Sequence, residues 1–232
     1  MTEHDGRHVQ RTEDRFVVGP SELRIDGDTL TIRVDELTVP LPRRLRGEIR
    51  LHMPERYDVR WDLDGDGHHH WQPIAPAARI EVDFEHPGLY WKGSGYLDSN
   101  DGSEPLEAGF RDWHWSRTPH GDGALLAYDA RRRDGSVLEL ALDYREGRIE
   151  PVERPPLRQL PTTLWRVARS ARAEADVSVA HTAEDTPFYA RSMLAHEIDG
   201  TPVRTMHESL DLDRFASRWV QTLLPFRMPR RR

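Results

Sequence analysis

Alternation of apolar and polar residues is the dominant pattern along the chain. In four segments every second residue is apolar and most residues between them are polar or charged: 30–34, 49–53, 80–84 and 138–144. A period of two places the apolar side chains of a strand on one face and the polar ones on the other. Each segment is therefore predicted to be an antiparallel strand with one face against a core.

The C-terminal part of the chain predicts a hairpin followed by a helix. Segments 189–198 and 203–210 flank Asp199-Gly200, a dipeptide that favours tight hairpin turns. In segment 211–224 apolar residues recur at helical spacing, and Pro225 is expected to end the helix.

A proline-rich segment, 150–161, is charged and has no periodicity, so it is interpreted as a linker. Elsewhere helix signals are few, and short strands follow one another at hairpin spacing. The expected fold class is all-β, an antiparallel barrel or sandwich with a short C-terminal helix.

Composition narrows the function classes. At 232 residues the chain is long enough for one large or two small domains. Its formal net charge of -7 argues against a nucleic-acid partner, and its lack of cysteine excludes disulfides, thiol nucleophiles and thiolate metal sites. No apolar leader or membrane-length apolar run is present, so we expect a soluble or peripheral protein of the cytoplasm. A short basic tail, 227–232, is interpreted as a solvated terminus that could also contact anionic lipid.

One stretch, Gly93–Arg117, is both strongly polar and strongly aromatic. Its candidate site residues, with Trp91 just before it, are Tyr96, Asp98, Asn100, Glu104, Glu107, Trp113 and Trp115. A mostly apolar pocket with a few placed polar groups is what a small-molecule site requires. Composition alone favours the other interpretation, a solvated hairpin whose aromatic residues pack a core, and the resemblance given below reverses that choice.

Two short runs contain possible metal ligands, but neither has the ligand pattern that a metal site requires. The run Asp62-Leu-Asp64-Gly-Asp66-Gly67 resembles the start of a calcium loop, but the position that requires a glutamate holds Pro73. The run His68-His-His70 lies on extended chain, where adjacent side chains point to opposite faces. We therefore expect no metal site, and a polar hairpin tip with one useful histidine.

Two short patterns remain, His69-x-Trp71 and Tyr96-x-Asp98. Each places two side chains on one face of a strand and joins an aromatic ring to a group that can move a proton. Geometry alone does not say that the two pairs meet.

Several longer motifs resemble those of the carotenoid 1,2-hydratases, also called hydroxyneurosporene synthases. The motifs are Gly95-Tyr-Leu-Asp98-Ser-Asn100, Glu104-Pro-Leu-Glu107, Phe110, Trp113-x-Trp115-Ser-Arg117, Trp71-x-Pro73-Ile-Ala-Pro76, Leu160-Pro-x-Thr163-Leu-Trp165, Glu184-Asp-Thr-Pro-Phe-Tyr-Ala-Arg191, Met206-His-Glu-Ser209 and Leu223-Leu-Pro-Phe-Arg-Met-Pro229. The resemblance implies tandem lipocalin-like β-domains, which we expect at 1–117 and 118–232. Members of the family begin upstream with a glycine-rich and aromatic segment, so the first domain is expected to lack its first strands.

The reaction that the resemblance implies is addition of water to the terminal C1–C2 double bond of an acyclic carotene such as neurosporene or lycopene. Protonation of such an alkene gives a tertiary carbocation, and a carboxyl group in an apolar pocket stays protonated because burial disfavours its anion. Asp98 is the expected acid, Trp71 and Tyr96 the expected stabilisers of the cation, and His69 the expected base toward water. The remaining candidate residues are expected to line the substrate site, and hydration requires no cofactor.

The expected partners are a hydrophobic carotene and, by peripheral contact, a membrane; the oligomeric state is left open. Two other functions stay open. A lipocalin-like carrier would use the same cavity without an acid, and a related polyene cyclase or isomerase would keep the acid but exclude water.

Overall fold

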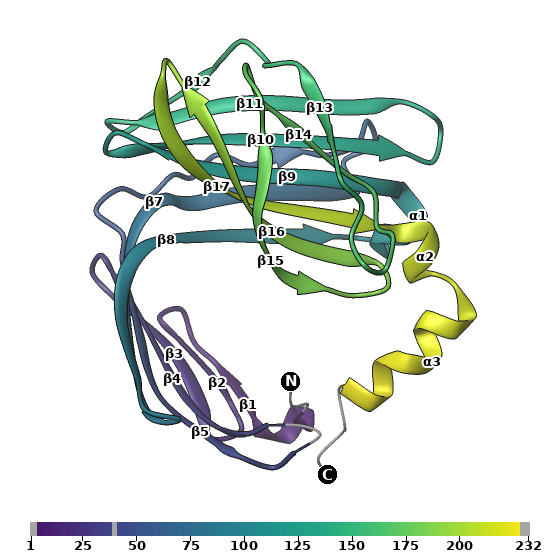
Figure 1. The fold of residues 1–232 in the computed structure, drawn as a ribbon. Coiled ribbons are helices and arrows are strands. Elements are labelled where there is room, and N and C mark those ends of the chain that lie inside the picture. Colours follow the sequence, from purple (N-terminus) through teal and green to yellow (C-terminus); the bar gives the residue numbers. More distant parts are fainter. Residues whose placement is uncertain (1–3, 39–40, 228–232) are drawn as a thin grey trace. The chain divides into compact units, whose positions relative to one another are not determined.

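The fold is built mostly from antiparallel strands, which confirms the predicted all-β class (Figure 1). The computed structural model describes residues 4–38 and 41–227. The chain divides into two compact units. The first comprises Met1–Arg56, Ala78–Tyr96 and Gln221–Arg232, and the second comprises Tyr57–Ala77 and Leu97–Val220. Both units are discontinuous in sequence, so the two consecutive lipocalin-like domains remain a prediction.

An eight-stranded sheet contains the N-terminal strands, in the order β1-β2-β3-β4-β5-β7-β6, with β8 paired to β7. After a short 3-10 helix, Gly6–His8, its strands are β1 Val9–Arg11, β2 Arg15–Val18, β3 Ser21–Asp26, β4 Thr29–Leu37, β5 Arg44–His52, β6 Trp61–Asp62, β7 His69–His86 and β8 Leu89–Gly102. The long strands β7 and β8 contribute residues to both units. The start of β7 and the end of β8 lie in the second unit and carry the candidate site.

A seven-stranded sheet follows in the order β12-β11-β10-β9-β17-β16-β15. Its strands are β9 Phe110–His120, β10 Gly123–Arg132, β11 Val137–Arg145, β12 Arg148–Pro151, β15 Ser178–Asp185, β16 Tyr189–Ile198 and β17 Thr201–Asp211, and β13 Leu157–Leu160 pairs with β14 Arg169–Arg172 in a separate ribbon. The central strand β9 pairs with β10 on one side and with the much later β17 on the other.

The core of the second unit is rich in large aromatic side chains. Phe110 is fully buried, and Trp71, Tyr128 and Tyr144 are at most 3% exposed. Arg117 of β9 is also buried and donates from Nε to the carbonyl oxygen of Pro76 on β7 at 2.6 Å. This bond satisfies a charged group inside the core and holds β9 against β7.

The predicted strands and hairpin are confirmed. The linker predicted at 150–161 and the single helix predicted at 211–224 are wrong. Asp199 and Gly200 form the predicted turn with φ values of 49° and 73°, the left-handed values that such turns require. The segment interpreted as a linker contributes Leu157–Leu160 as β13, because its backbone pairs with β14.

The predicted helix 211–224 is divided into α2, Leu212–Phe215, and α3, Arg218–Arg227. Asp211 caps α2 by accepting from the backbone N–H of Arg214 at 2.9 Å, and the Ser217 hydroxyl donates to the Arg214 carbonyl at 2.5 Å. The Asp211 bond caps the start of α2, whereas the Ser217 bond competes with continuation of the helix beyond its one turn. Pro225 does not end the helix, because α3 continues to Arg227.

One further helix, α1 Leu106–Gly109, connects β8 to β9. Across the described ranges, none of the helices has the length and apolar character needed to span a bilayer.

Candidate active site

The structure brings the two predicted sequence pairs together through Asp98. Trp71 of β7 donates from its indole Nε1 to Asp98 Oδ2 of β8 at 3.0 Å. Asn100, two residues farther along β8, donates from Nδ2 to the same oxygen at 3.4 Å. Trp71 is only 1% exposed and Asp98 is half-buried. A carboxyl group is thus held at the edge of the aromatic core by two neutral donors.

His69 lies on the same face of β7 as Trp71 and is 1% exposed. Its Nδ1 is 2.7 Å from Asp64 Oδ2. Burial raises the pKa of Asp64, but hydrogen bonds from the His68 N–H, the His69 ring and the Asp66 N–H outweigh this effect and lower the pKa to about 2. Asp64 is therefore ionised at neutral pH and accepts a hydrogen bond from the Nδ1–H of His69.

The other ring nitrogen of His69, Nε2, is buried and has no hydrogen-bond partner among the described residues. With the proton on Nδ1 directed at Asp64, the lone pair of the neutral ring is on Nε2. Asp64 and His69 thus form a pair in which the carboxylate orients the ring and the ring presents a proton acceptor.

Two glycines make room for the His69 ring. A Cβ at Gly102 would lie 2.9 Å from His69 Cδ2, and a Cβ at Gly109 would lie 2.8 Å from His69 Cε1. Both distances are shorter than normal contacts between carbon atoms. The backbone of β8 and of α1 therefore contacts the ring directly and fixes its position.

Aromatic rings continue from His69 to Trp71 around the site. The ring centroids are 5.0 Å apart for His69 and Phe110, 6.3 Å for Phe110 and Trp113, 6.0 Å for Trp113 and Tyr128, and 5.2 Å for Tyr128 and Trp71. Burial is the main cause that raises the pKa of Tyr128, so this phenol stays neutral. The arrangement offers electron-rich ring faces to a developing positive charge.

Three other predicted site residues differ from one another in burial and in the groups they contact. Trp115 is buried and lies opposite Tyr128 in the β9–β10 register. Glu104 is exposed, and its Oε1 lies beside Gly109. Glu107 is half-buried in α1, where its backbone carbonyl, not its carboxylate, accepts from Arg133 Nε at 3.0 Å.

Trp91 and Tyr96 lie on the part of β8 that belongs to the first unit. Trp91 is 43% exposed, whereas Tyr96 is half-buried. Their predicted roles at the site remain predictions.

Sequence reasoning missed Asp64, Phe110 and Tyr128 as members of the cluster. Asp64 was considered only as a calcium ligand. The available signal was the Gly65-Asp66-Gly67 turn, with Gly67 at a φ of 70°, which returns the chain so that Asp64 meets His69. Tyr128 could not be assigned without knowing that β10 pairs with β9.

The three adjacent histidines contact different groups, as expected for extended chain. His68 Nδ1 is 2.7 Å from Ser103 Oγ, and His70 Nε2 is 3.2 Å from Asp62 Oδ1. Within the described ranges, no group of three or more histidine, cysteine, aspartate or glutamate side chains is placed to hold a metal ion.

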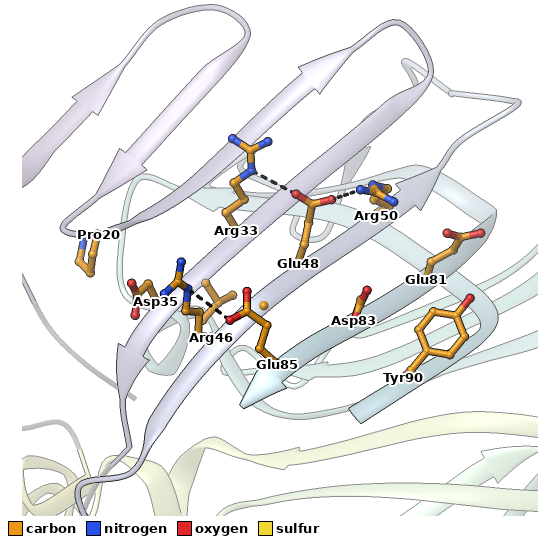
Figure 2. Close-up of a pocket in the computed structure, with 12 residues that line it drawn as sticks. Pro20, Arg33, Asp35, Arg46, Glu48, Arg50, Glu81, Asp83, Glu85 and Tyr90 are labelled. Carbon is orange, nitrogen blue, oxygen red and sulfur yellow. Dashed lines mark hydrogen bonds and ion pairs between the residues drawn. The ribbon is translucent and has the colours of Figure 1, made fainter. Parts of the chain in front are cut away.

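A cavity of about 720 Å³ lies in the first unit, and its lining is charged, unlike the aromatic cluster around Asp98 (Figure 2). Figure 2 shows charged side chains of β4, β5 and β7 in ion pairs over it. Arg33 Nε is 3.1 Å from Glu48 Oε2, and Arg46 Nε is 3.8 Å from Glu85 Oε2. Such a lining does not suit a hydrocarbon.

A second cavity, of about 410 Å³, lies in the second unit and is lined by His114 and Arg169 among others. Neither cavity is lined by Asp98, His69 or Trp71. The candidate site is therefore defined by the side-chain cluster and not by either cavity.

Comparison with known proteins identifies the family of this chain. The family Carotenoid hydratase CrtC matches residues 1–232. The chain is 47% identical over 235 residues to the acyclic carotenoid 1,2-hydratase of Thiocapsa roseopersicina, covering 99% of this chain, and 44% identical over 235 residues to that of Rubrivivax gelatinosus, covering all of it. The chain spans 58% of the length of each of these relatives.

A crystal structure described as AttH, from Nitrosomonas europaea, shares the fold with a TM-score of 0.58 at 12% sequence identity. The match covers 89% of this chain and 72% of that one. The match over the whole chain and the identity to the two hydratases lead to one conclusion: this chain belongs to the carotenoid hydratase CrtC family.

Proposed function

We propose that the protein is a hydro-lyase that adds water to the terminal C1–C2 double bond of an acyclic carotene of the neurosporene or lycopene class. The observation that carries the proposal is the Asp98 carboxyl group, held by Trp71 at the edge of an aromatic cluster, in a chain of the carotenoid hydratase family. Relatives with 47% and 44% identity are named acyclic carotenoid 1,2-hydratases.

The first chemical step is protonation of the alkene by Asp98. The electron pair of the double bond takes the proton at C2, which leaves a tertiary cation at C1 and a carboxylate at Asp98. Trp71 and Asn100 both donate to Oδ2, the oxygen that is the carbonyl of a protonated carboxyl group. They stabilise the carboxylate that forms, so proton donation becomes less costly.

Aromatic faces stabilise the cation until water adds. The ring quadrupoles of Trp71 and Trp113 attract positive charge without competing as nucleophiles, and a similar role for Tyr96 stays a prediction. A positively charged or strongly basic lining would either repel the cation or remove its proton. The cluster around Asp98 is suited to hold the cation for the next step.

Water then attacks C1, and its proton passes to Nε2 of His69, which is oriented by Asp64. The new C–O bond uses a lone pair of water, and the histidine proton finally returns to the Asp98 carboxylate through solvent. The net change is one water added per double bond. Because no electrons leave the substrate, the reaction needs no redox cofactor.

The site must meet a substrate that dissolves in the bilayer, so we also propose peripheral membrane contact. The apolar helix near Leu223 and the basic tail are the parts of the sequence expected to make this contact. Leu223 is 45% exposed on α3, whereas residues 228–232 of the tail lie outside the described residues. Screening by high salt should weaken whatever part of the contact is ionic.

The experiment is hydration of lycopene in labelled water, with the Asp98→Asn variant as comparison. In deuterated water the product should carry one deuterium at the carbon next to the alcohol carbon, and labelled oxygen should appear in the hydroxyl. Asp98→Asn should reduce turnover by roughly a thousandfold or more while carotene binding changes little, because the proton is needed only in the transition state.

Three outcomes would contradict the proposal. Near-normal turnover by Asp98→Asn would remove Asp98 as the acid, and Glu104 or Glu107 would be tested next. A product without added oxygen would indicate a cyclase or an isomerase. Carotene binding by the wild-type chain without any product would indicate a carrier.

A further inference from the structure

A turn on the second unit presents apolar side chains to solvent. Leu164 is 97% exposed, and its neighbour Trp165 is 45% exposed. Both lie between β13 and β14, in the turn from Thr163 to Val167. An isolated exposed leucine is ordinary on a protein surface, but a leucine at the tip of a turn beside an exposed tryptophan is not explained by packing.

Hydrogen bonds hold this turn in one conformation. Leu164 N–H donates to Asp185 Oδ2 at 2.8 Å, and Arg166 N–H donates to the Thr163 carbonyl at 2.9 Å. Val167 N–H donates to the hydroxyl of the buried Thr163 at 3.1 Å. The apolar tip is therefore a fixed feature of the fold and not a loose loop.

A second exposed tryptophan extends the apolar surface. Trp219 of α3 is 47% exposed and stacks on Trp165, with ring centroids 6.2 Å apart and planes at 27°. Arg214 donates from Nη1 to the carbonyl of Trp165 at 2.6 Å and ties the turn to the start of the helical segment. Leu164, Trp165 and Trp219, all in the second unit, are called the Leu-Trp surface below.

Positive charge borders the Leu-Trp surface. Arg166 and Arg218 are exposed, and Arg214 is half-buried next to Trp165. Of the acidic groups in this region, Asp185 accepts a hydrogen bond from Leu164 N–H, and Asp213 forms an ion pair with Arg133. A local cluster of arginines on a chain with a net charge of -7 favours an anionic partner at this place.

We propose that the Leu-Trp surface is the contact of this protein with the headgroup region of an anionic phospholipid membrane. Tryptophan prefers the membrane interface, leucine adds apolar area that enters the acyl boundary, and arginine pairs with lipid phosphate. The inference rests on the proposed membrane contact and assigns it to a different surface from the basic tail.

The test is sedimentation with vesicles of phosphatidylcholine and phosphatidylglycerol, without carotene. Leu164→Gln removes an almost fully exposed side chain, so the fold should be retained. Its vesicle partition coefficient should fall about tenfold, the effect of losing one leucine from an apolar environment. The matched control is Leu157→Gln on β13, a leucine 45% exposed outside the surface, and it should bind as the wild type does.

The contribution of charge to vesicle binding is tested with Arg166→Gln. The matched control is Arg204→Gln, at an exposed position on β17. Arg166→Gln should weaken binding about fivefold on phosphatidylglycerol vesicles, which corresponds to roughly 1 kcal/mol per arginine near the surface. On pure phosphatidylcholine the same variant should bind as the wild type does. Arg204→Gln should change binding to neither vesicle.

Each negative result of these vesicle experiments would contradict a different part of the proposal. Absence of wild-type binding to any vesicle would overturn the membrane contact itself. Wild-type binding that Leu164→Gln leaves unchanged would overturn only the assigned surface. A change in oligomeric state by Leu164→Gln, with unaltered vesicle binding, would make the surface a contact between copies. Hydration of detergent-solubilised lycopene should be unaffected by Leu164→Gln, which separates this inference from the catalytic proposal.

Discussion

His69 illustrates how one side chain acquires a role from its neighbours. Its position on β7 follows from the alternating pattern of the strand, but its orientation depends on Asp64 and on the space left by Gly102 and Gly109. With Nδ1 directed at a carboxylate, the tautomer is fixed and Nε2 becomes the proton acceptor. The position of one proton thus depends on residues that the sequence pattern does not link to His69.

Replacement of Asp64 by asparagine tests this dependence. Asp64→Asn keeps the size of the side chain but removes the charge that stabilises the imidazolium formed when His69 takes a proton. Turnover should fall about a hundredfold with little change in KM. A loss in kcat with little change in KM is what removal of an interaction made only in the transition state produces.

Asp62→Asn is the control for this variant, since Asp62 is exposed and lies near His70 instead of His69. It should leave turnover unchanged. An Asp64→Asn variant with wild-type turnover would show that the carboxylate does not support the base.

Secondary-structure elements differ in how well the sequence predicts them. The alternating segments at 30–34 and 138–144 became β4 and β11, because period two and burial of one face act locally along a strand. The strand β13 was missed because its pairing with β14 supplies hydrogen bonds that no local pattern announces. The same limit applies to the site. The motifs predicted Asp98 and Trp71 separately, and only the pairing of β8 with β7 made them neighbours.

Gly109, at the junction of α1 and β9, provides a test of whether these elements fix the His69 ring. Gly109→Ala would place a methyl group 2.8 Å from His69 Cε1, so the ring or the backbone must move. We expect a loss of about 1–3 kcal/mol in the free energy of unfolding and a larger relative loss of turnover. Urea unfolding and steady-state kinetics measure the two effects.

Gly6→Ala is the matched control, because a Cβ at Gly6 meets no atom within 4 Å. It should change neither quantity. If Gly109→Ala had wild-type turnover, the close packing of the His69 ring would not matter for the reaction.

For the molecule as a whole, the stability of the fold at acid pH should depend on a stacked pair of imidazoles, of which His207 is buried. His114 and His207 stack with centroids 6.0 Å apart, and both contact the Ser209 hydroxyl, at 2.9 and 3.1 Å. Burial, and then the nearby His114 and Arg169, lowers the pKa of His207 to about 3 from an ordinary 6.5. The folded protein therefore keeps His207 neutral where the unfolded chain binds a proton.

Because the unfolded chain binds a proton at His207 that the folded protein does not, the free energy of unfolding should fall as the pH falls. Stability from His207 is fully present above pH 6.5 and is lost as pH falls toward 3, with a slope of about 1.4 kcal/mol per pH unit. His207→Gln should flatten this part of the profile in urea unfolding measured across pH, even if it lowers stability at pH 8. His181→Gln, at an exposed position, should keep the wild-type slope. An unchanged slope in His207→Gln would contradict the assignment.

The late pairing of β9 with β17 has a consequence for synthesis on the ribosome. Ser209, which bonds to His114 across these strands, is added 95 residues after it. At roughly 5–20 residues per second, β9 waits on the order of 5 to 20 seconds for its second partner. During that interval one edge of the strand is open to other nascent chains. The protein should therefore depend on chaperones during translation more than after it, and slower elongation between codons 120 and 200 should reduce the yield of folded protein.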